Sequence, residues 1–382
     1  MKARKILLLG SYGQSNLGDD LLMWNYLKLL ESKGAREVYV NANTTKFIPD
    51  VIKKAFPNLH IVLTYETSFT QYVRLIRSVD CIVYGGGTLY KELYSSTGRS
   101  PYGVIIRLMG FNLLAALLGT KVYHLNIGIG SLKTKIGRFI TKRALSAATK
   151  TIFRDKESYM LARDTLKVAP QRIQQSVDGL FIDPVWRSIW HTKNLKIDRK
   201  KYKHVVGVNV LSDIPDWIDR DAYVQTMRRF VTTILERGDY ILFIPFQTDF
   251  NPRNDLKFMR EIFGDMLKGR SGFTMLDKVP IDLIHSYMAQ CDLLVGMRFH
   301  SLLLASTCEL PFVAIAYDTK CWRFIEEIDY PYAVKLENLQ YDPLMTLYDR
   351  AMSSRDATRQ QLRAATEKMY NQAEDDLRTL NL

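Results

Sequence analysis

The sequence predicts an α/β protein with two doubly wound, Rossmann-like domains that face a central cleft. Short buried apolar runs alternate with helical patterns along most of the chain, as in parallel sheets with crossover helices. A chain of 382 residues is also too long for one ordinary core. The alternation stops at a basic, weakly apolar segment and then restarts. We therefore place an N-terminal domain at 1–186, a linker at 187–203 and a C-terminal domain with a helical tail at 204–382.

Apolar runs of four or five residues predict the strands of the first half, at Lys5–Leu9, Val38–Asn41, Ile61–Thr64, Cys81–Tyr84, Val122–Asn126 and Thr151–Arg154. Apolar residues at helical spacing predict helices at Leu21–Lys33, Thr45–Phe56, Ser68–Ser78 and Asp155–Leu166. Asp155 is expected to cap the last of these helices, with Ser158 nearby. The segment Asp178–Pro184 closes this half.

The second half repeats the alternation. Its strands are expected at Val205–Val210, Tyr240–Pro245, Leu293–Gly296 and Phe312–Ala316. Its helices are expected at Tyr223–Arg237, Leu256–Leu267, Ile281–Gln290 and Ser301–Cys308, with another that runs to Ile328. Phe246–Asn254 is expected to be a polar turn, and Asp342–Leu380 forms the charged helical tail.

A glycine-rich turn joins the first strand to the first helix. The segment from Gly10 to Asp20 includes Ser11 and Asn16, in a layout where backbone N–H groups and a helix N-terminus can bind an anion. It contains neither G-x-G-x-x-G nor the lysine and serine or threonine that close a P-loop. Asp19 and Asp20 are candidates for acid/base chemistry, and either could instead be the N-cap of the helix.

Two more strands of the first half end in glycines. Gly86 and Gly87 follow one strand, and Gly128 and Gly130 follow another. Such glycines indicate that the backbone closely approaches either a ligand or a neighbouring helix. Because parallel strands bring their carboxyl ends to one edge, these turns should line one side of the cleft. Arg154, at a further strand end, is a candidate anion ligand.

The strongest candidate site lies in the second half, where Arg298 and His300 follow a buried strand. In open α/β sheets this strand-to-helix turn faces the ligand crevice. Histidine can exchange a proton near neutral pH, and arginine suits carboxylate or phosphate. Together they suggest an acid/base site for an anionic substrate. The alternative is structural: His300 packs at the start of the helix and Arg298 makes an ion pair.

The chain has 53 basic and 40 acidic residues, a net charge of +13. This balance favours anionic partners, namely a phosphorylated small molecule, an acidic membrane surface or nucleic acid. Lys133–Lys156 carries eight of the basic residues, with Ile136, Phe139, Ile140 and Leu145 at helical spacing among them. Such a helix can lie on an anionic membrane. The commoner arrangement packs the apolar stripe on the sheet and leaves the basic face in water.

The cysteines lie far apart, at Cys81, Cys291, Cys308 and Cys321. We expect reduced thiols of a cytosolic protein, because no zinc or disulfide spacing is present. The N-terminus is typical of a first strand and not of a signal peptide. The longest apolar stretch, Gly103–Leu118, is interrupted by Arg107 and Asn112 and is shorter than the roughly 20 residues of a membrane span, so we predict no transmembrane helix. We expect no metal or cofactor, because no residue cluster has ligand spacing.

Six motifs in order resemble those of the polysaccharide pyruvyl transferases: Gly10-x-x-Gly13-x-x-Asn16-x-Gly18-Asp19-Asp20, Gly85-Gly86-Gly87, Gly128-x-Gly130, Arg154-Asp155-x-x-Ser158, Gly296-Met297-Arg298-Phe299-His300 and Tyr317-Asp318-x-Lys320. The likeness runs from Lys5 to about Ile328 and implies a fold similar to the GT-B glycosyltransferases. Two departures could alter acceptor preference. Asp20 stands where the family often has glutamate, and His124 stands where many relatives have a small or amide residue.

The resemblance implies a reaction in which phosphoenolpyruvate donates its enolpyruvyl group to two hydroxyls of a sugar. The product is a pyruvyl ketal, commonly in a lipid-linked precursor of an exopolysaccharide or capsule. It also implies that His300 protonates the methylene carbon and that Arg298 binds the phosphate or carboxylate, with Arg154 as a second clamp. Asp19 or Asp20 could be the base. The N-terminal domain is assigned to the acceptor, and the other substrate-binding candidates are the motif residues Ser11, Asn16, Gly86, Gly87, Gly128, Gly130, Asp318 and Lys320.

Two other functions stay open on the sequence. A nucleotide-sugar glycosyltransferase of the GT-B type would have the same architecture, since fold does not determine reaction. The net charge also motivates a binder of nucleic acid or acidic membrane. We expect no nucleic-acid partner, because aromatic residues do not alternate with the basic ones and no nucleic-acid fold signature is present. The expected location is the cytoplasm, with peripheral contact to the anionic inner face of the cell membrane, where a lipid-linked acceptor is found.

Overall fold

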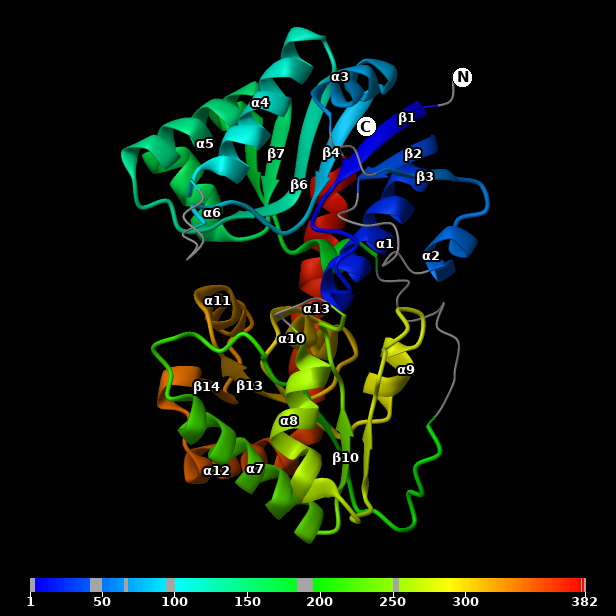
Figure 1. The fold of residues 1–382 in the computed structure, drawn as a ribbon, viewed down its shortest axis with the longest axis vertical. Helices are drawn as coiled ribbons and strands as arrows, with labels where there is room; N and C mark the ends of the chain where they lie inside the picture. Colours follow the sequence, from blue (N-terminus) through cyan, green and yellow to red (C-terminus); the bar gives the residue numbers. More distant parts are fainter. Residues whose placement is uncertain are drawn as a thin grey trace. The chain divides into compact units, whose positions relative to one another are not determined.

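The computed structural model describes residues 4–41, 50–64, 68–93, 100–183, 195–249, 254–378 and 380. The chain divides into two compact units (Figure 1). Unit 1 comprises Met1–Gln14, Asp19–Asp183 and Met369–Leu382. Unit 2 comprises Ser15–Gly18 and Pro184–Lys368. Each unit is built on its own parallel sheet.

The sheet of unit 1 follows the order β3-β2-β1-β4-β6-β7-β8, with β5 paired to β6. Its strands are β1 (Arg4–Leu9), β2 (Ala35–Asn41), β3 (His60–Thr64), β4 (Cys81–Gly85), β5 (Thr88–Tyr90), β6 (Lys121–Ile129), β7 (Lys150–Phe153) and β8 (Ile173–Gln175). All of their pairings are parallel. The strand order reverses between β1 and β4, as it does in dinucleotide-binding sheets.

The helices of unit 1 are α1 (Leu17–Ser32), whose first two residues belong to unit 2, α2 (Asp50–Ala55), α3 (Phe69–Ser78), α4 (Gly103–Leu117), α5 (Lys135–Ala147) and α6 (Lys156–Met160). α4 and α5 lie side by side (Figure 1), and the Asn112 side chain on α4 donates to the Ala144 carbonyl on α5 at 3.1 Å. Ser68 and Gln71 form a capping box at the start of α3, and Asp155 caps α6 through the Ser158 N–H, as predicted.

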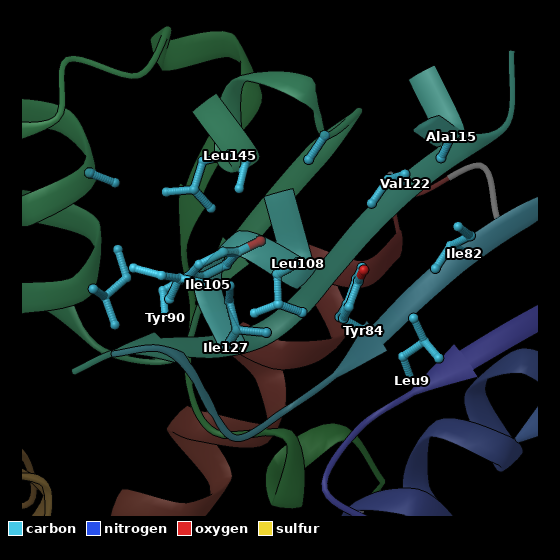
Figure 2. Packing of buried hydrophobic residues seen from close by; sticks show 14 of the residues in the cluster. Leu9, Ile82, Tyr84, Tyr90, Ile105, Leu108, Ala115, Val122, Ile127 and Leu145 are labelled. Carbon is cyan, nitrogen blue, oxygen red and sulfur yellow. The ribbon is translucent and has the colours of Figure 1, made fainter. Parts of the chain in front are cut away.

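The core of unit 1 packs between the sheet and the helices α4 and α5. Figure 2 shows Ile105 and Leu108 of α4 and Leu145 of α5 among the side chains of the strands. All three are buried, and β4 and most of β6 are buried along both faces. Each large side chain buried in this way contributes about 1.5–3 kcal/mol. The burial of both faces explains why these strands appear in the sequence as continuous apolar runs.

The sheet of unit 2 has the order β11-β10-β9-β12-β13-β14. Its strands are β9 (Val205–Val208), β10 (Tyr240–Phe243), β11 (Phe273–Met275), β12 (Leu293–Gly296), β13 (Phe312–Ala316) and β14 (Ala333–Lys335), all paired in parallel. Numbered in chain order this is 3-2-1-4-5-6, the Rossmann order, with the reversal between β9 and β12.

The helices of unit 2 are α7 (Arg220–Glu236), α8 (Asp255–Leu267), α9 (Ile284–Ala289), α10 (Phe299–Thr307), α11 (Thr319–Glu327), α12 (Tyr341–Ser353) and α13 (Arg355–Arg378), of which the last ends in unit 1. Aspartate or asparagine side chains cap three of them, at Asp219, Asn254 and Asp318. These caps explain where the helices begin, because each satisfies N–H groups that have no partner within the helix.

The predicted doubly wound class is confirmed, and every strand predicted from an apolar run is present. Four short strands were not predicted: β5, β8, β11 and β14. Each has only three residues, too few to show a periodic pattern. For the apolar stretch Gly103–Leu118, the sequence excludes a membrane span, but no helix was predicted there. In the structure this stretch forms α4. In the described part of the chain, no helix combines the length and apolar character needed to cross a membrane.

The C-terminal tail divides differently from the prediction. Residues Met369–Leu382 group with unit 1, although we had placed the whole tail in the C-terminal domain. The reason is local packing. Tyr370 packs edge-on against Phe181 at 5.7 Å, and the Lys33 ammonium donates to the Leu377 carbonyl at 2.9 Å. Of the predicted linker, 187–194 lies outside the described residues and 195–203 is irregular.

Candidate functional site

Arg298 lies at the point of unit 2 where the strand order reverses. It lies two residues after the end of β12 and directly before α10, in the strand-to-helix turn where the sequence predicted it. Asn209, which follows β9, accepts the Arg298 N–H through its Oδ1 at 2.9 Å and donates to the Ile244 carbonyl beyond β10 at 2.9 Å. One buried amide thus connects the carboxyl ends of β9, β10 and β12. In open α/β sheets this switch point is where ligands bind.

The Arg298 guanidinium is engaged by Asp255, a residue that the sequence analysis did not select. Nε and Nη2 of Arg298 donate to the two carboxylate oxygens at 3.0 and 2.5 Å. Asp255 is fully buried and the Arg298 side chain is 15% exposed. Burial lowers the pKa of Arg298, but the charge and hydrogen bonds of Asp255 outweigh it and raise that pKa overall. Arg298 is therefore a fixed, charged fork whose Nη1 lies outside the ion pair.

A short piece of chain from the glycine-rich turn packs onto this part of unit 2. Ser15–Gly18 runs antiparallel to 246–248, with a bridge between Asn16 and Gln247. The Leu17 N–H donates to the Phe246 carbonyl at 2.9 Å, and the Gln247 N–H donates to Asp255 at 3.0 Å. The Asp255 carboxylate therefore connects Arg298 to the bridge that holds Ser15–Gly18.

Gly18 lies directly against the imidazole of His300, the second residue of α10. A Cβ atom at Gly18 would lie 2.0 Å from His300 Nδ1 and 2.4 Å from its Cγ. Real atoms do not approach so closely, so position 18 has no room for any side chain while His300 keeps this rotamer. The glycine of the Gly18-Asp19-Asp20 motif is thus explained by the histidine of another motif.

Lys320 and Asp318 lie beside the same motif. Asp318 caps α11 through the Cys321 N–H at 3.0 Å and pairs with the Lys320 ammonium at 3.2 Å. That ammonium lies 5.6 Å from the Phe299 ring centre and 5.4 Å from that of Tyr317. Burial raises the pKa of Tyr317 to about 12, although the charges of Lys320 and Arg298 act against it. The predicted site residues Arg298, His300, Asp318 and Lys320 therefore lie in unit 2, together with the half-buried phenol of Tyr317.

The predicted residues of the glycine-rich turn divide between the units, with Asn16 in unit 2 and Ser11, Asp19 and Asp20 in unit 1. The helix cap is Asn16, whose Oδ1 accepts the Gly18 N–H at 3.0 Å. Asp19 and Asp20 follow in the first turn of α1, where the helix dipole favours negative charge. Asp19 is half-buried and Asp20 is buried, whereas Ser11 is exposed. Asn16 is therefore the N-cap of α1, and the alternative explanation of Asp19 or Asp20 as the cap does not hold.

The glycines of unit 1 divide between packing and open space. A Cβ at Gly86 would lie 2.9 Å from Leu22 of α1, and one at Gly130 would lie 2.8 Å from the Lys91 side chain. Gly86 thus admits a side chain of a neighbouring helix, the second of the two explanations offered, whereas Gly130 admits a side chain that lies outside any helix. Gly87 has a φ of +79° with nothing within 4 Å of its Cβ position, so its need for glycine is conformational.

Arg154 is bound within unit 1 by several side chains. It donates to Asp178 at 3.0 Å and to the Thr88 hydroxyl at 2.8 Å, and its Nε lies 3.1 Å from the Cβ position of Gly128. Arg154 and Asp178 are both buried. A buried pair of this kind accounts for the arginine on structural grounds, so its use as a second anion clamp remains a prediction.

His124 lies inside unit 1 and contacts no solvent. Its Nδ1 bonds the Thr151 hydroxyl at 2.8 Å, and its Nε2 lies 3.0 Å from the Tyr90 hydroxyl and 3.2 Å from Asn112 Nδ2. Burial lowers the pKa of His124 to about 3, so the ring is neutral at physiological pH. An effect of this residue on the acceptor would have to be transmitted through the core.

Asn209, Asp255, Gly18 and Tyr317 were missed as separate site residues. Asn209 carried the same signal as Arg298, a polar residue at the end of a buried strand, and could have been found by that rule. Asp255 could not, because an acidic residue in the first turn of a helix is ordinary. Within the described ranges, no three histidine, cysteine or acidic side chains gather closely enough to hold a metal ion.

Comparison with known proteins identifies the family. The family model of the polysaccharide pyruvyl transferases matches residues 16–319, which span Asn16, Gly18, Arg154, Arg298 and His300. The chain belongs to the polysaccharide pyruvyl transferase family. A curated relative is the amylovoran biosynthesis protein AmsJ of Erwinia amylovora, 19% identical over 308 residues that cover 78% of this chain and 71% of AmsJ.

Solved structures similar to this pyruvyl transferase family member share its fold. A putative UDP-N-acetylglucosamine 2-epimerase from Listeria monocytogenes gives a TM-score of 0.66 at 12% identity, covering 98% of this chain and 95% of its own. MnaA of S. aureus with UDP gives 0.64 at 12%, covering 99% and 98%. A glycosyltransferase from Rickettsia africae gives 0.56 at 13%, covering all of both chains. At such identities the likeness shows the GT-B-like fold alone.

Proposed function

We propose that this family member is a ketal pyruvyl transferase. It moves the enolpyruvyl group of phosphoenolpyruvate onto two hydroxyls of a sugar and releases phosphate. The observation that supports this most is the pairing of Arg298 with His300 at the switch point of unit 2, with the arginine held by Asp255 and the imidazole packed on Gly18. It provides an oriented charged donor for an anion beside a group that can deliver a proton.

In the proposed reaction His300, as imidazolium, protonates the methylene carbon of phosphoenolpyruvate while one sugar hydroxyl attacks the adjacent carbon. Phosphate then leaves that carbon, and the second hydroxyl replaces it, which closes the ketal. Arg298 stabilises the phosphate as it departs. The Lys320 ammonium lies beside the rings of Tyr317 and Phe299, next to the Arg298 and His300 motif, and adds a second positive charge there. The two hydroxyl protons leave to a base and to the released phosphate.

We assign the base to Asp19 or Asp20. Asp19 follows Gly18 directly in the chain, and Gly18 packs on His300. Both aspartates lie in the first turn of α1. Ser11, Asn16, Gly86, Gly87, Gly128, Gly130 and Arg154 are assigned to the sugar. The named relative acts in amylovoran biosynthesis, and we propose an acceptor of the same general class, a sugar of an exopolysaccharide or capsule precursor. The proposed location is the cytoplasm, at the inner face of the membrane.

The decisive experiment incubates the protein with phosphoenolpyruvate and candidate sugar acceptors. Mass spectrometry should find the mass increment of a pyruvyl ketal, together with phosphate release that requires the acceptor. His300→Gln should reduce turnover by about 100-fold or more, the usual contribution of a general acid. The matched control is His60→Gln, because His60 is exposed on unit 1. Full activity of His300→Gln would eliminate His300 as the acid.

The competing function is a nucleotide-sugar glycosyltransferase or epimerase, since two of the similar solved structures are named as a glycosyltransferase and a putative epimerase. A thermal shift with uridine diphosphate sugars, without one for phosphoenolpyruvate, would favour it. Arg298→Lys tests the role assigned to Arg298 in the pyruvyl transferase. A lysine cannot make the two-pronged bond to Asp255 or present a planar fork, so phosphoenolpyruvate use should fall sharply.

A further inference from the structure

The positive charge of the chain is concentrated in one stretch of unit 1. From Leu93 to Arg154 the sequence contains ten lysines and arginines and neither aspartate nor glutamate. The rest of the chain has 53 − 10 = 43 basic and 40 acidic residues, so this stretch supplies 10 of the 13 net charges. Arg154 is buried against Asp178, whereas the exposed lysines and arginines in the described part of this stretch have no acidic residue within it, so the surface that they form attracts anions.

The same stretch exposes large apolar side chains. The described part of the chain has six such side chains, and four of them lie on α4 and α5: Ile106, Leu117, Ile136 and Phe139. Ile136 and Phe139 are 56% and 62% exposed, whereas Ile140 and Leu145 of the same helix are buried. The apolar stripe predicted for α5 is thus split, with half packed on the sheet and half facing water.

The two helices present these residues side by side. α4 and α5 are joined by the Asn112–Ala144 hydrogen bond, and both are crossover helices of successive parallel strands, so they run in the same direction. Their inward faces carry Ile105, Leu108, Ala115 and Leu145 (Figure 2). The outward faces then form one surface, which we call the α4–α5 face and define by Ile106, Arg107, Ile136, Phe139, Lys142 and Arg143, all exposed.

We propose that the α4–α5 face docks unit 1 onto an anionic lipid bilayer. Lysine and arginine next to aliphatic and aromatic side chains is the composition of interfacial helices, in which the apolar residues enter the headgroup boundary and the cations bind lipid phosphates. A nucleic-acid surface would use several stacking aromatics or polar base contacts, whereas this face has one aromatic side chain, Phe139, and its isoleucines, Ile106 and Ile136, provide neither. The proposal does not depend on the proposed reaction, because its readout is binding.

The test measures co-sedimentation of the full chain with vesicles. Binding is expected with mixed phosphatidylcholine and phosphatidylglycerol, little with phosphatidylcholine alone, and less as salt rises. Lys142→Gln with Arg143→Gln should lower the partition coefficient about 25-fold, since each surface charge contributes about fivefold. Ile136→Ser with Phe139→Ser should lower it about tenfold or more, because the apolar insertion is lost.

Two control proteins test whether binding depends on the α4–α5 face or on surface charge and exposed apolar side chains anywhere on the chain. Lys268→Gln with Arg270→Gln removes the same charge from exposed positions of unit 2, and Trp217→Ser removes a 74% exposed apolar side chain there. Both control proteins should bind the vesicles as the native chain does. Three outcomes would each overturn the proposal. The first is equal binding to neutral and anionic vesicles, and the second is an equal loss of binding in the control proteins. The third is salt-dependent binding to DNA that Ile136→Ser with Phe139→Ser leaves unchanged. All of the substituted positions are exposed, and circular dichroism checks that each variant is folded.

Discussion

The Arg298 guanidinium shares its site with a fully buried carboxylate. Its ion pair with Asp255 joins the turn after β12 to the start of α8 and, through Gln247, to the segment Ser15–Gly18. An arginine that only captured an anion from solvent would need no such partner. In the proposed function, the pair orients the fork in advance, which would reduce the entropy lost when a substrate binds.

Removing one side chain of the Asp255–Arg298 pair should destabilise unit 2 more than removing both. Asp255→Ala leaves a buried arginine uncompensated and should destabilise unit 2 by about 3–5 kcal/mol, whereas Asp255→Ala with Arg298→Met should recover part of that loss. Hydrogen exchange of β9 and β12 measures the effect within unit 2. If the single and double variants lose the same protection, the two side chains are not energetically coupled.

A methyl group at position 18 should disturb His300 specifically. Gly18→Ala places Cβ within 2.0 Å of His300 Nδ1, so either the ring or the segment must move, at about 1–3 kcal/mol. Proton donation by a displaced imidazole should fall, and turnover with it, while the affinity for phosphoenolpyruvate changes less. Gly264→Ala is the control, because its Cβ in α8 meets nothing within 4 Å and should stabilise by up to about 1 kcal/mol. Unchanged turnover in Gly18→Ala would show that His300 has another productive rotamer.

At the scale of elements, α5 depends on one buried carboxylate outside it. Glu92 accepts the N–H groups of Lys133 and Thr134 at 3.0 Å each and the Thr134 hydroxyl at 2.7 Å. Thr134 in turn caps α5. A helix whose first turn is basic gains from a negative charge at its N-terminus, and here that charge comes from a residue after β5.

Glu92→Ala should therefore loosen the start of α5. Two N–H groups and a hydroxyl lose their acceptor, which costs about 1–3 kcal/mol for each group left buried. Hydrogen exchange of the amides at 133–138 should accelerate, and that of α4 should change less. Glu92→Gln keeps an acceptor oxygen and should show a smaller effect. Equal protection in native and alanine proteins would mean that water replaces the carboxylate fully.

His124 links β6 to β5, β7 and α4 and makes unit 1 sensitive to acid. Its folded pKa of about 3 lies below the ordinary value of about 6.5, so the unfolded chain takes up a proton first as the pH falls. The stability that the neutral ring contributes is complete above pH 6.5 and is lost toward pH 3, by about 2 kcal/mol at pH 5. His124→Gln should flatten the pH dependence of unit 1 unfolding in this range, and His60→Gln should not. The same slope in both variants would contradict the assignment to His124.

At the scale of the whole molecule, the chain passes between the two units at Gln14, Gly18, Asp183 and Lys368. Each unit therefore completes its fold with a distant piece of sequence. Unit 2 includes Ser15–Gly18 from the first turn of the chain, and unit 1 includes Met369–Leu382 from the last helix. Neither unit can be isolated by a single cut without losing part of its packing.

A chain truncated after Lys368 should lose unit 1 stability selectively. The removed segment buries Tyr370, Leu377 and Leu380, which together contribute on the order of 5 kcal/mol. Protection against hydrogen exchange in β1 and β8 should fall while that in β9 and β12 persists. Gln361→Ala is the complementary control, since Gln361 of α13 bonds the Asp329 carbonyl at 2.8 Å in unit 2. Equal losses in both units would mean that they unfold as one.

The sequence by itself determined the fold class, the positions of the longer strands and of most helices, and the positions of the motifs. Runs such as Leu293–Gly296 are apolar because both faces of a parallel strand are covered, and that requirement is local enough to be read directly. The same logic placed Arg298 at a strand end. The resemblance of the motifs then indicated the family that the comparison identified.

Only the tertiary structure decided what each site residue contacts. Asp255 and Arg298 are 43 residues apart, and Gly18 and His300 are 282 apart, so no local pattern announces either pair. The assignment of Met369–Leu382 to unit 1 and the exposure of Ile136 and Phe139 are of the same kind. Periodicity shows that a helix has an apolar face, but which neighbour covers that face depends on contacts between segments far apart in the chain.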